Sequence, residues 1–467
     1  MFKGWSRSTF SGAPRRTGKA MKRMAGDLGA LCTRQAEETF GALLPAALLA
    51  GPPGSRSRIF TVPVVFWTFL CQILGSASCR MATDSVQSLL SHLGKALCSS
   101  SDAAYCMARA KLSIRVLVAI QRHLATALCP RPGPRTFVFD GTTISMPDTP
   151  TNQACWPQSS SQGTGVGFPI MRIVGLFDLA TGVWIAMARG TLAGSKRGSE
   201  RTLWRRLWKH LRAGDTVVAD AGFCDWFSLV LLHRRGVRLV LRNNGRRKPS
   251  PGSTRLGKGD RLERWRKPVV KPAWVSQAEY ESLPDSIAVR VVTVTAPQES
   301  GFRTLELELT TTVIDPAEMS AEEIGGLYLR RWDVELFIDD LKTSLGMDIL
   351  RTRSPRMIYR ELLMHVIAYN LLRALILQAD DPRRVSFKGT LDRINRWLPM
   401  AMATTCKRTR KRLIDDLLET IAEDIVRERP NRREPRLKKR RPKPFGLMTK
   451  PRGEAMEIPH RSRYRKS

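Results

Sequence analysis

The sequence has few acidic side chains and lacks the cysteine and histidine patterns of disulfide-rich and zinc-binding proteins. Asp and Glu total 42 against 77 Lys and Arg. The nine cysteines are odd in number and no two are spaced CxxC, and the six histidines form no HxxxH pair. A secreted disulfide framework and a four-ligand zinc site are therefore disfavoured. We expect most of the cysteines to be buried as small apolar residues in a reducing cytoplasm.

The sequence also lacks an apolar run long enough for a membrane span. Its most apolar segment, residues 60–74 (FTVPVVFWTFLCQIL), contains Pro63 and Gln72 and is shorter than the roughly 20 residues that a span needs. We expect it to form a buried helix. The basic N-terminus is not followed by an apolar run and a small-residue cleavage site, which argues against a signal peptide. No membrane partner is expected.

The chain does have enough apolar residues for a core and a large excess of positive charge. Hydrophobic residues make up 42% of 467 residues, and this length predicts two or three domains. The formal net charge is +35, and residues 430–443 (PNRREPRLKKRRPK) are mostly basic. Nucleic acid is the commonest partner of so basic a chain. An acidic membrane surface and a merely solubilising charge are the alternatives.

The periodicity of apolar residues changes at residues 129–135 (CPRPGPR), which mark a domain boundary. Before this boundary, helices are expected over 85–97 and 103–128. After it, the pattern predicts a mixed α/β layout with strands at 136–145, 170–179, 183–188, 215–219 and 237–242 and helices at 199–211 and 225–235. Residues 243–285 are expected to interrupt this layout. Two strands, 287–295 and 304–313, and two helices, 321–345 and 357–377, follow.

Two aspartates come at or just past predicted strands and are each followed by a small residue. Asp140 stands in TFVFDGT and Asp220 in TVVADAG. Strand ends are where open α/β sheets place functional side chains. A carboxylate there is costly to bury unless a cation offsets the desolvation, as a metal ion would. The alternative is that each aspartate only forms a turn.

The predicted helix 321–345 carries the most informative spacing. Tyr328, Arg331, Glu335 and Lys342 fall on one stripe about 60° wide in an ideal helix, beside an apolar face. A carboxylate flanked by cations suits a site for phosphate and metal. Asp339 lies near the stripe and is a rival carboxylate, and a solvated face with ion pairs is the alternative. Three carboxylates from separate segments suit two Mg²⁺ ions and phosphoryl transfer.

These residues resemble a known family. Tyr328-x2-Arg331-x3-Glu335-x6-Lys342 matches the Y-R-E-K signature of the DDE transposases of insertion sequence family 4. Asp140-Gly-Thr and Asp220-Ala-Gly-Phe resemble the first and second acidic motifs of that family, in the same order. The similarity covers about residues 55–375.

The resemblance implies an α/β fold, with a ribonuclease H-like mixed-sheet catalytic core, a mostly β insertion and a helical N-terminal domain. It implies Asp140, Asp220 and Glu335 as catalytic metal ligands for two Mg²⁺ ions, or Mn²⁺ in their place. Tyr328, Arg331 and Lys342 would then bind DNA. The reaction would be hydrolysis at the 3′ ends of a transposon followed by attack of the 3′-OH on target DNA, by a homodimer on double-stranded DNA in the cytoplasm, associated with the nucleoid.

The predicted organisation has seven parts. They are a basic N-terminal segment (1–55), a helical, DNA-binding N-terminal domain (56–130), the first part of the catalytic core (131–242), an insertion (243–313), the core helices with the signature (314–380), a helical C-terminal region (381–429) and a basic tail (430–467).

The sequence leaves open whether the protein is catalytic, whether it joins DNA as well as cutting it, and whether a tryptophan contacts a flipped base. A non-catalytic nucleic-acid-binding protein, such as a decayed transposase, and a related nuclease without strand transfer are the alternatives. Some relatives stack a flipped base on a tryptophan of the insertion, but the strand 304–313 has none. Trp265 and Trp274 lie earlier and are as well suited to a core or surface role. Asp148, Asp215 and Asp225 are expected to be structural.

Overall fold

The computed structural model describes residues 18–50, 59–130, 132–193, 198–243, 252–296, 305–427 and 448–454. Most of the predicted basic tail and the start of the basic N-terminal segment lie outside the described residues. The chain divides into two compact units, residues 1–120 with 392–419, and residues 121–391 with 420–467. Within the described ranges, no helix has the length and hydropathy that a membrane crossing requires.

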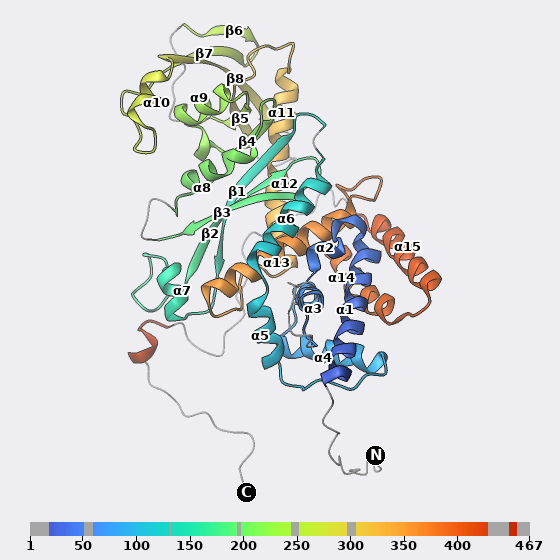
Figure 1. The fold of residues 1–467 in the computed structure, drawn as a ribbon. Coiled ribbons are helices and arrows are strands. Elements are labelled where there is room, and N and C mark those ends of the chain that lie inside the picture. The colour runs from blue at the N-terminus through green and yellow to red at the C-terminus, as the bar shows by residue number, and fades with distance from the viewer. Residues whose placement is uncertain are drawn as a thin grey trace. The chain divides into compact units, whose positions relative to one another are not determined.

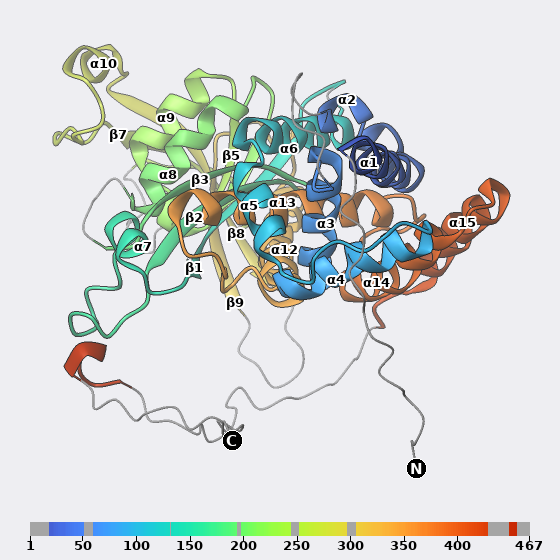
Figure 2. The same ribbon diagram turned by 60° about the horizontal axis from the view of Figure 1, so that its bottom comes forward.

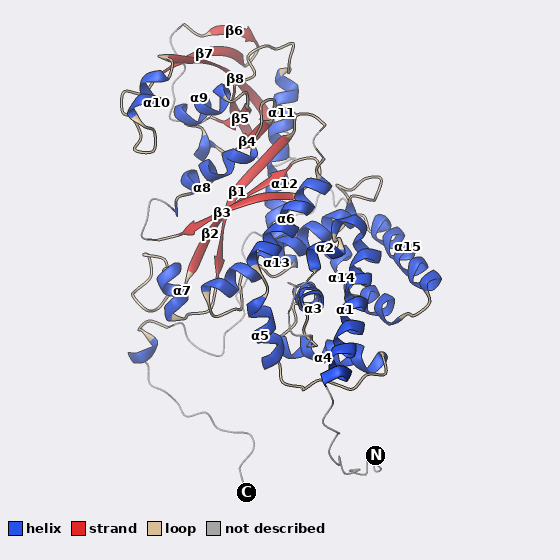
Figure 3. Cartoon of the chain, in the orientation of Figure 1, coloured by secondary structure: helices blue, strands red, loops and turns tan. Residues whose placement is uncertain are grey.

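The first unit is built from helices alone (Figure 3). They are α1 (Gly18–Phe40), α2 (Ala46–Leu49), α3 (Val62–Leu74), α4 (Cys79–His92), α5 (Ala103–Lys111) and the start of α6 (Ile114–Leu128), joined by parts of α14 (Phe387–Ala403) and α15 (Lys407–Glu423). The apolar segment expected as a buried helix is α3, whose residues are mostly buried. Trp67 of α3 donates to Met402 Sδ at 3.0 Å, which fixes α14 to it.

Two of the helices in this unit differ from the sequence prediction. Helix α4 begins at Cys79 rather than at residue 85, because the Ser78 side chain accepts a hydrogen bond from the Met81 N–H and caps it. The single helix expected over 103–128 is wrong. It divides at Leu112 into α5 and α6, since Leu112 has φ and ψ of −57° and 125° and cannot continue the helix.

The second unit contains one nine-stranded sheet in the order β3-β2-β1-β4-β5-β9-β8-β7-β6. The strands are β1 (Thr136–Ser145), β2 (Ile170–Asp178), β3 (Trp184–Thr191), β4 (Thr216–Ala219), β5 (Arg238–Arg242), β6 (Thr254–Gly257), β7 (Asp260–Arg266), β8 (Ser286–Ala296) and β9 (Leu305–Thr311). Strand β1 pairs antiparallel with β2 and parallel with β4, and β4 pairs parallel with β5. This mixed sheet confirms the expected α/β core of ribonuclease H-like type.

Helices cover both faces of this sheet (Figures 1 and 2). On one face, α8 (Glu200–Leu207) and α9 (Trp226–Arg234) pack on side chains such as Phe137, Phe139 and Val217. On the other lie α11 (Ala321–Leu329) and α12 (Asp333–Asp339), with α13 (Pro355–Ile376), whose Tyr369 ring packs on Phe177. Because strand side chains alternate, Val138 and Val218 point to the α11–α12 face.

The segment 243–285 was expected to interrupt the α/β layout at the start of a mostly β insertion, and its described residues do form strands, which add to the edge of the existing sheet. Strands β6 and β7 pair with each other, and β7 pairs with β8 over seven residues, so the segment extends the same sheet. A short helix, α10 (Gln277–Ser282), follows. The sequence of β7 is rich in basic residues and shows no clear apolar alternation, so it did not predict a strand. Backbone pairing with β8 stabilises this strand.

The helix expected over 321–345 is not continuous. Helix α11 ends at Leu329. A 3₁₀ turn (Arg330–Trp332), α12 and a π-helical turn (Asp340–Ser344) follow it in succession. The ideal angles of the signature stripe therefore do not hold along its whole length. The expected apolar face is kept in part, since Val334, Leu341 and Leu345 are buried.

Candidate functional site

Two acidic residues occupy equivalent positions on neighbouring parallel strands. The register pairs Thr136 with Thr216 and Val138 with Val218. Asp140 and Asp220 each follow this last pair by two residues, Asp140 inside β1 and Asp220 directly after the end of β4. Both side chains follow the alternation of the two valines and therefore face α11 and α12. This is the face on which Glu335 of α12 also lies, and α12 contacts β1.

The two aspartates differ in local structure. Asp140 lies inside β1 rather than in a turn, is half-buried, and its Oδ1 accepts the Gly141 N–H at 2.7 Å. Asp220 is exposed and caps a 3₁₀ turn (Ala221–Phe223), with its Oδ1 accepting the Ala221 N–H at 2.7 Å. The turn-forming alternative is therefore wrong for Asp140 and holds in part for Asp220. Each carboxylate keeps its second oxygen for another partner.

The signature residues bring a third carboxylate to the same face. Arg331 donates to Glu335 Oε1 at 3.1 Å, and the Glu335 side chain is 47% exposed. Arg331 itself is buried, and its Nε has no hydrogen-bond partner among the described residues. Tyr328 is buried beside it. Burial raises the pKa of Tyr328 to about 12, against the charge of Arg331, and the negative charge of Asp220 adds to the rise.

The electrostatics of Asp140 connect it to this group. Burial raises the pKa of Asp140 above its usual value, while the Gly141 N–H and the charge of Arg331 oppose the rise. The charges of Glu200 and Glu335 raise it further. Asp140 therefore lies within the field of one signature cation and of two other carboxylates. A divalent cation at this place would relieve that repulsion.

Glu200 is a fourth carboxylate of the site that the sequence analysis missed. It begins α8, and its Oε1 lies 3.7 Å from Arg172 Nε. A Cβ added at Gly141 would stand 2.7 Å from the Glu200 side chain, so only glycine lets Glu200 approach β1 this closely. The signal was weak in sequence: Ser199-Glu200 reads as an ordinary helix start, with Ser199 capping the Thr202 N–H as expected.

The remaining signature residue and its neighbours have separate positions. Lys342 lies half-buried in the π-helical turn, and in the described part of the chain it makes no ion pair. Asp339 is exposed and accepts a hydrogen bond from the Thr343 hydroxyl at 2.6 Å. Trp332, which the sequence analysis did not single out, is 50% exposed and its ring lies 4.7 Å from the Arg331 guanidinium.

The rival acids expected to be structural accept hydrogen bonds from the protein itself, two of them from backbone N–H groups. Asp215 is buried and accepts the N–H groups of Arg135 and Arg212. Asp225 caps α9 through the Ser228 N–H. Asp148 accepts a hydrogen bond from the Gln153 side chain at 2.8 Å.

Of the two tryptophans of the insertion, Trp265 lies in the core and Trp274 packs against it. Trp265 is buried, and its Nε1 donates to Glu263 Oε2 at 2.8 Å. Trp274 is partly buried beside Trp208. Trp265 therefore cannot stack on a base without unfolding its surroundings.

The carboxylates suit a hard cation by type but form an open arrangement. Among the described residues, one group of three potential metal ligands (His, Cys, Asp or Glu) has its ligand atoms within 4.8 Å of one another, and it is Cys79, Asp102 and Cys106. Asp140, Asp220 and Glu335 do not form such a group. Two Mg²⁺ ions are typically about 3.5–4 Å apart, so ligands that bridge them need not touch one another. In the described part of the chain, Asp140 and Asp220 each use one carboxylate oxygen in a hydrogen bond, so the other oxygen fits such a site.

Comparisons with known proteins identify the family of the chain. Residues 131–371, just over half of the chain, match the family described as transposase DDE domain. The transposase InsG for insertion sequence element IS4 of Escherichia coli (strain K12) is 26% identical over 320 residues, covering 66% of this chain and 68% of that protein. The cryo-EM structure of a piggyBac transposase synaptic complex with hairpin DNA aligns at 11% identity over 87% of this chain and 86% of that one, with a TM-score of 0.42.

The mixed sheet, with one acidic residue inside β1 and another directly after the neighbouring parallel strand β4, defines a ribonuclease H-like core. The chain belongs to the DDE transposase family, of the insertion sequence family 4 type. The expected resemblance is thereby confirmed, and the protein is a DNA transposase, an enzyme that cleaves and joins DNA.

Proposed function

We propose that Asp140, Asp220 and Glu335 are the catalytic carboxylates of this transposase and hold two Mg²⁺ ions, or Mn²⁺ in their place. The observation that carries the proposal is that Asp140 and Asp220 each follow the last pair of the parallel β1–β4 ladder by two residues, and that α12, which carries Glu335, contacts β1. The charges of Arg331 and Glu335 act on Asp140, and the charge of Asp220 acts on Tyr328. When bound, such ions activate the attacking oxygen and stabilise the leaving one in an in-line phosphoryl transfer.

The residues around the carboxylates orient them and the DNA. Arg331 holds Glu335 through its guanidinium, whose planar fork of donors also suits a phosphate oxygen. Lys342 makes no ion pair in the described ranges, so it supplies a further cation for the phosphate backbone of the DNA. Because Tyr328 is buried, little of its surface is available to DNA, and its role is to position Arg331.

The DNA would react in two steps at this one site. Water attacks the phosphorus at the element end, the bond to the 3′ oxygen breaks, and a 3′-OH remains. That hydroxyl then attacks a phosphorus of target DNA, the bond from this phosphorus to the 3′ oxygen of the target strand breaks, and the target strand leaves with a free 3′-OH. Two ends must be joined in one event, which favours a homodimer on double-stranded DNA. The net charge of +35 supports tight binding to DNA that weakens as the salt concentration rises. The transposase would act in the cytoplasm, associated with the nucleoid when it is bound to DNA.

The test compares two carboxylates of the same helix. Glu335→Gln should abolish Mg²⁺-dependent nicking of DNA that carries the repeats flanking the coding region, and should keep DNA binding. Asp339→Asn is the matched control, because Asp339 is exposed and, among the described residues, its side chain forms a hydrogen bond with Thr343 alone. Normal cleavage by Glu335→Gln would refute the assignment.

The same substrates separate the two alternatives. A non-catalytic binding protein would bind the ends and cleave nothing, with or without Mg²⁺. A nuclease without joining activity would nick the ends but would not insert precut ends with a free 3′-OH into a target plasmid. The transposase is expected to do both.

A further inference from the structure

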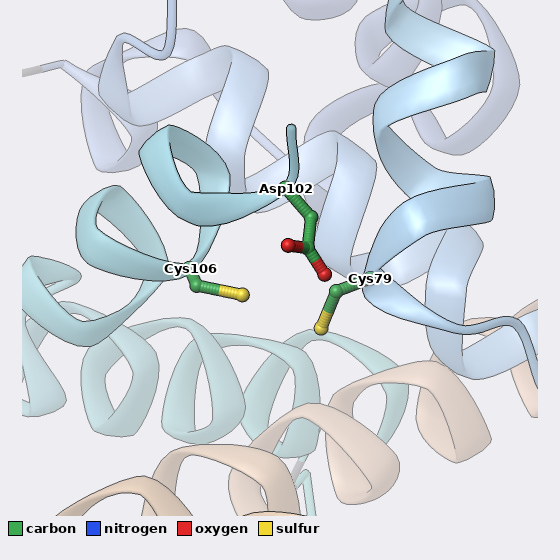
Figure 4. Close-up of side chains that lie close together, drawn as sticks. All are labelled: Cys79, Asp102 and Cys106. Carbon is green, nitrogen blue, oxygen red and sulfur yellow. The ribbon is translucent and has the colours of Figure 1, made fainter. Parts of the chain in front are cut away.

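Three side chains of the first unit lie together without a role in the proposed chemistry. Cys79 opens α4, Asp102 precedes α5 and Cys106 lies one turn into α5. Their two sulfur atoms and one carboxylate oxygen all lie within 4.8 Å of one another. Figure 4 shows the three side chains pointing into a common space between the two helices.

Asp102 is the residue before α5, and its side chain accepts no capping hydrogen bond. Its φ and ψ of −77° and −2° are already helical, and the Ser101 hydroxyl accepts the Ala103 N–H at 3.3 Å. The Asp102 carboxylate turns toward the two thiols instead (Figure 4).

We propose that Cys79, Asp102 and Cys106 form a site for one thiophilic divalent cation, Zn²⁺, in the helical unit. Two sulfurs and one oxygen are ligands that Zn²⁺ accepts, and tetrahedral bonds of about 2.0–2.3 Å separate ligand atoms by roughly 3.5–3.8 Å. The three side chains need to move by only a fraction of their present separation to reach this spacing. All three are half-buried, so an ion can enter.

The surroundings favour three protein ligands and an open fourth position. Gln72 Nε2 lies 3.6 Å from Cys79 Sγ, but its Oε1 already accepts hydrogen bonds from Tyr105 and Arg109. Water or a further ligand would complete the tetrahedron. Two thiolates and one carboxylate leave one negative charge around Zn²⁺, and the nearby guanidinium of Arg109 offsets it.

Metal binding would compete with protons at the thiols. Burial and then the Cys79 thiol raise the pKa of Cys106 to about 11, while the charge of Arg109 opposes the rise. Thiolates, not thiols, bind metals, so the affinity for the metal should increase with pH.

The prediction that most cysteines are buried is wrong. Cys32, Cys129 and Cys224 are buried, four others are half-buried, and Cys155 and Cys406 are exposed.

The experiment uses the full-length, reduced and chelator-treated protein with Co²⁺ as a spectroscopic probe. We expect one equivalent to produce a thiolate-to-cobalt charge-transfer band that Zn²⁺ abolishes. Carboxylate sites in the core give no such band. Cys98→Ser, a nearby cysteine outside the cluster, should keep the band, and Cys79→Ser with Cys106→Ser should lose it. Asp102→Asn should weaken Zn²⁺ binding at least tenfold.

A second readout guards against loss of fold. Zn²⁺ should raise the unfolding temperature of the parent protein and of Cys98→Ser, but not of the double variant, whose circular dichroism should stay helical. The absence of a thiolate band in the reduced parent protein would overturn the proposal. So would an undiminished band in the folded double variant.

Discussion

Arg331 donates a hydrogen bond to Glu335 across 3.1 Å, one turn further along the signature segment. The pair joins a buried cation to a half-exposed carboxylate, so Arg331 fixes the direction in which Glu335 points. Its planar fork can serve Glu335 and a second acceptor together, which an ammonium cannot do with the same geometry.

Arg331→Lys should therefore slow cleavage without unfolding the protein. Loss of one preorganised donor near a reacting phosphate typically costs about 100-fold in rate. The measurement is the single-turnover cleavage rate at saturating DNA and Mg²⁺, with the unfolding temperature as control. An unchanged rate would show that Glu335 is oriented by other contacts.

Trp332 gives a test of how DNA is held beside the carboxylates. The ring is half exposed next to Arg331, so truncation should leave stability nearly unchanged. A base stacked on it would make Trp332→Ala lose about 1–3 kcal/mol of DNA binding, roughly 5- to 150-fold. Leu336→Ala, 65% exposed one turn away, is the control and should bind almost normally. Fluorescence anisotropy with end-containing DNA measures both, and equal affinities would exclude stacking on Trp332.

Two consecutive glycines in α11 should respond in opposite directions. A Cβ at Gly325 would stand 2.9 Å from Val294 of β8, whereas a Cβ at Gly326 meets nothing within 4 Å. Gly325→Ala should destabilise the protein by about 1–3 kcal/mol through overpacking. Gly326→Ala should stabilise it by about 0.5–1 kcal/mol through helix propensity. Denaturant titration checks both signs, and a stabilising Gly325→Ala would mean that α11 does not press on β8.

Asp340 should impose a pH dependence on stability. Burial raises its pKa from 3.8 to about 7, although Arg373 donates to its carboxylate at 3.1 Å. The folded protein then binds more protons than the unfolded chain between these values. The free energy of unfolding should fall as pH rises from about 4 to about 7, by at most about 1.4 kcal/mol per pH unit from this group. Asp340→Asn should remove that part of the slope in denaturant titrations at several pH values; an unaltered slope would contradict it.

The strands and the family could be predicted from sequence because local signals agreed with the fold. Strand β1 spans the residues expected from its pattern, and Ser199 and Asp225 cap helices as their positions indicated. The interruption of the 321–345 helix could not be foreseen, since apolar periodicity cannot tell an α turn from a 3₁₀ or π turn. Glu200 was missed because its approach to Gly141 depends on packing of α8 on the sheet, between residues distant in sequence. The assignments of metal ligands and domain limits stay predictions.

The way the first unit is assembled bears on how the protein is made. Helices α3 and α1 receive contacts from residues near the other end of the chain: Asn395 donates to the Leu74 carbonyl at 2.8 Å, and Arg410 pairs with Glu38 at 2.9 Å. All strands of the sheet leave the ribosome before those late residues do. The nine-stranded sheet can therefore fold during translation, whereas Trp67 and its neighbours must wait, shielded by other means, until synthesis is nearly finished.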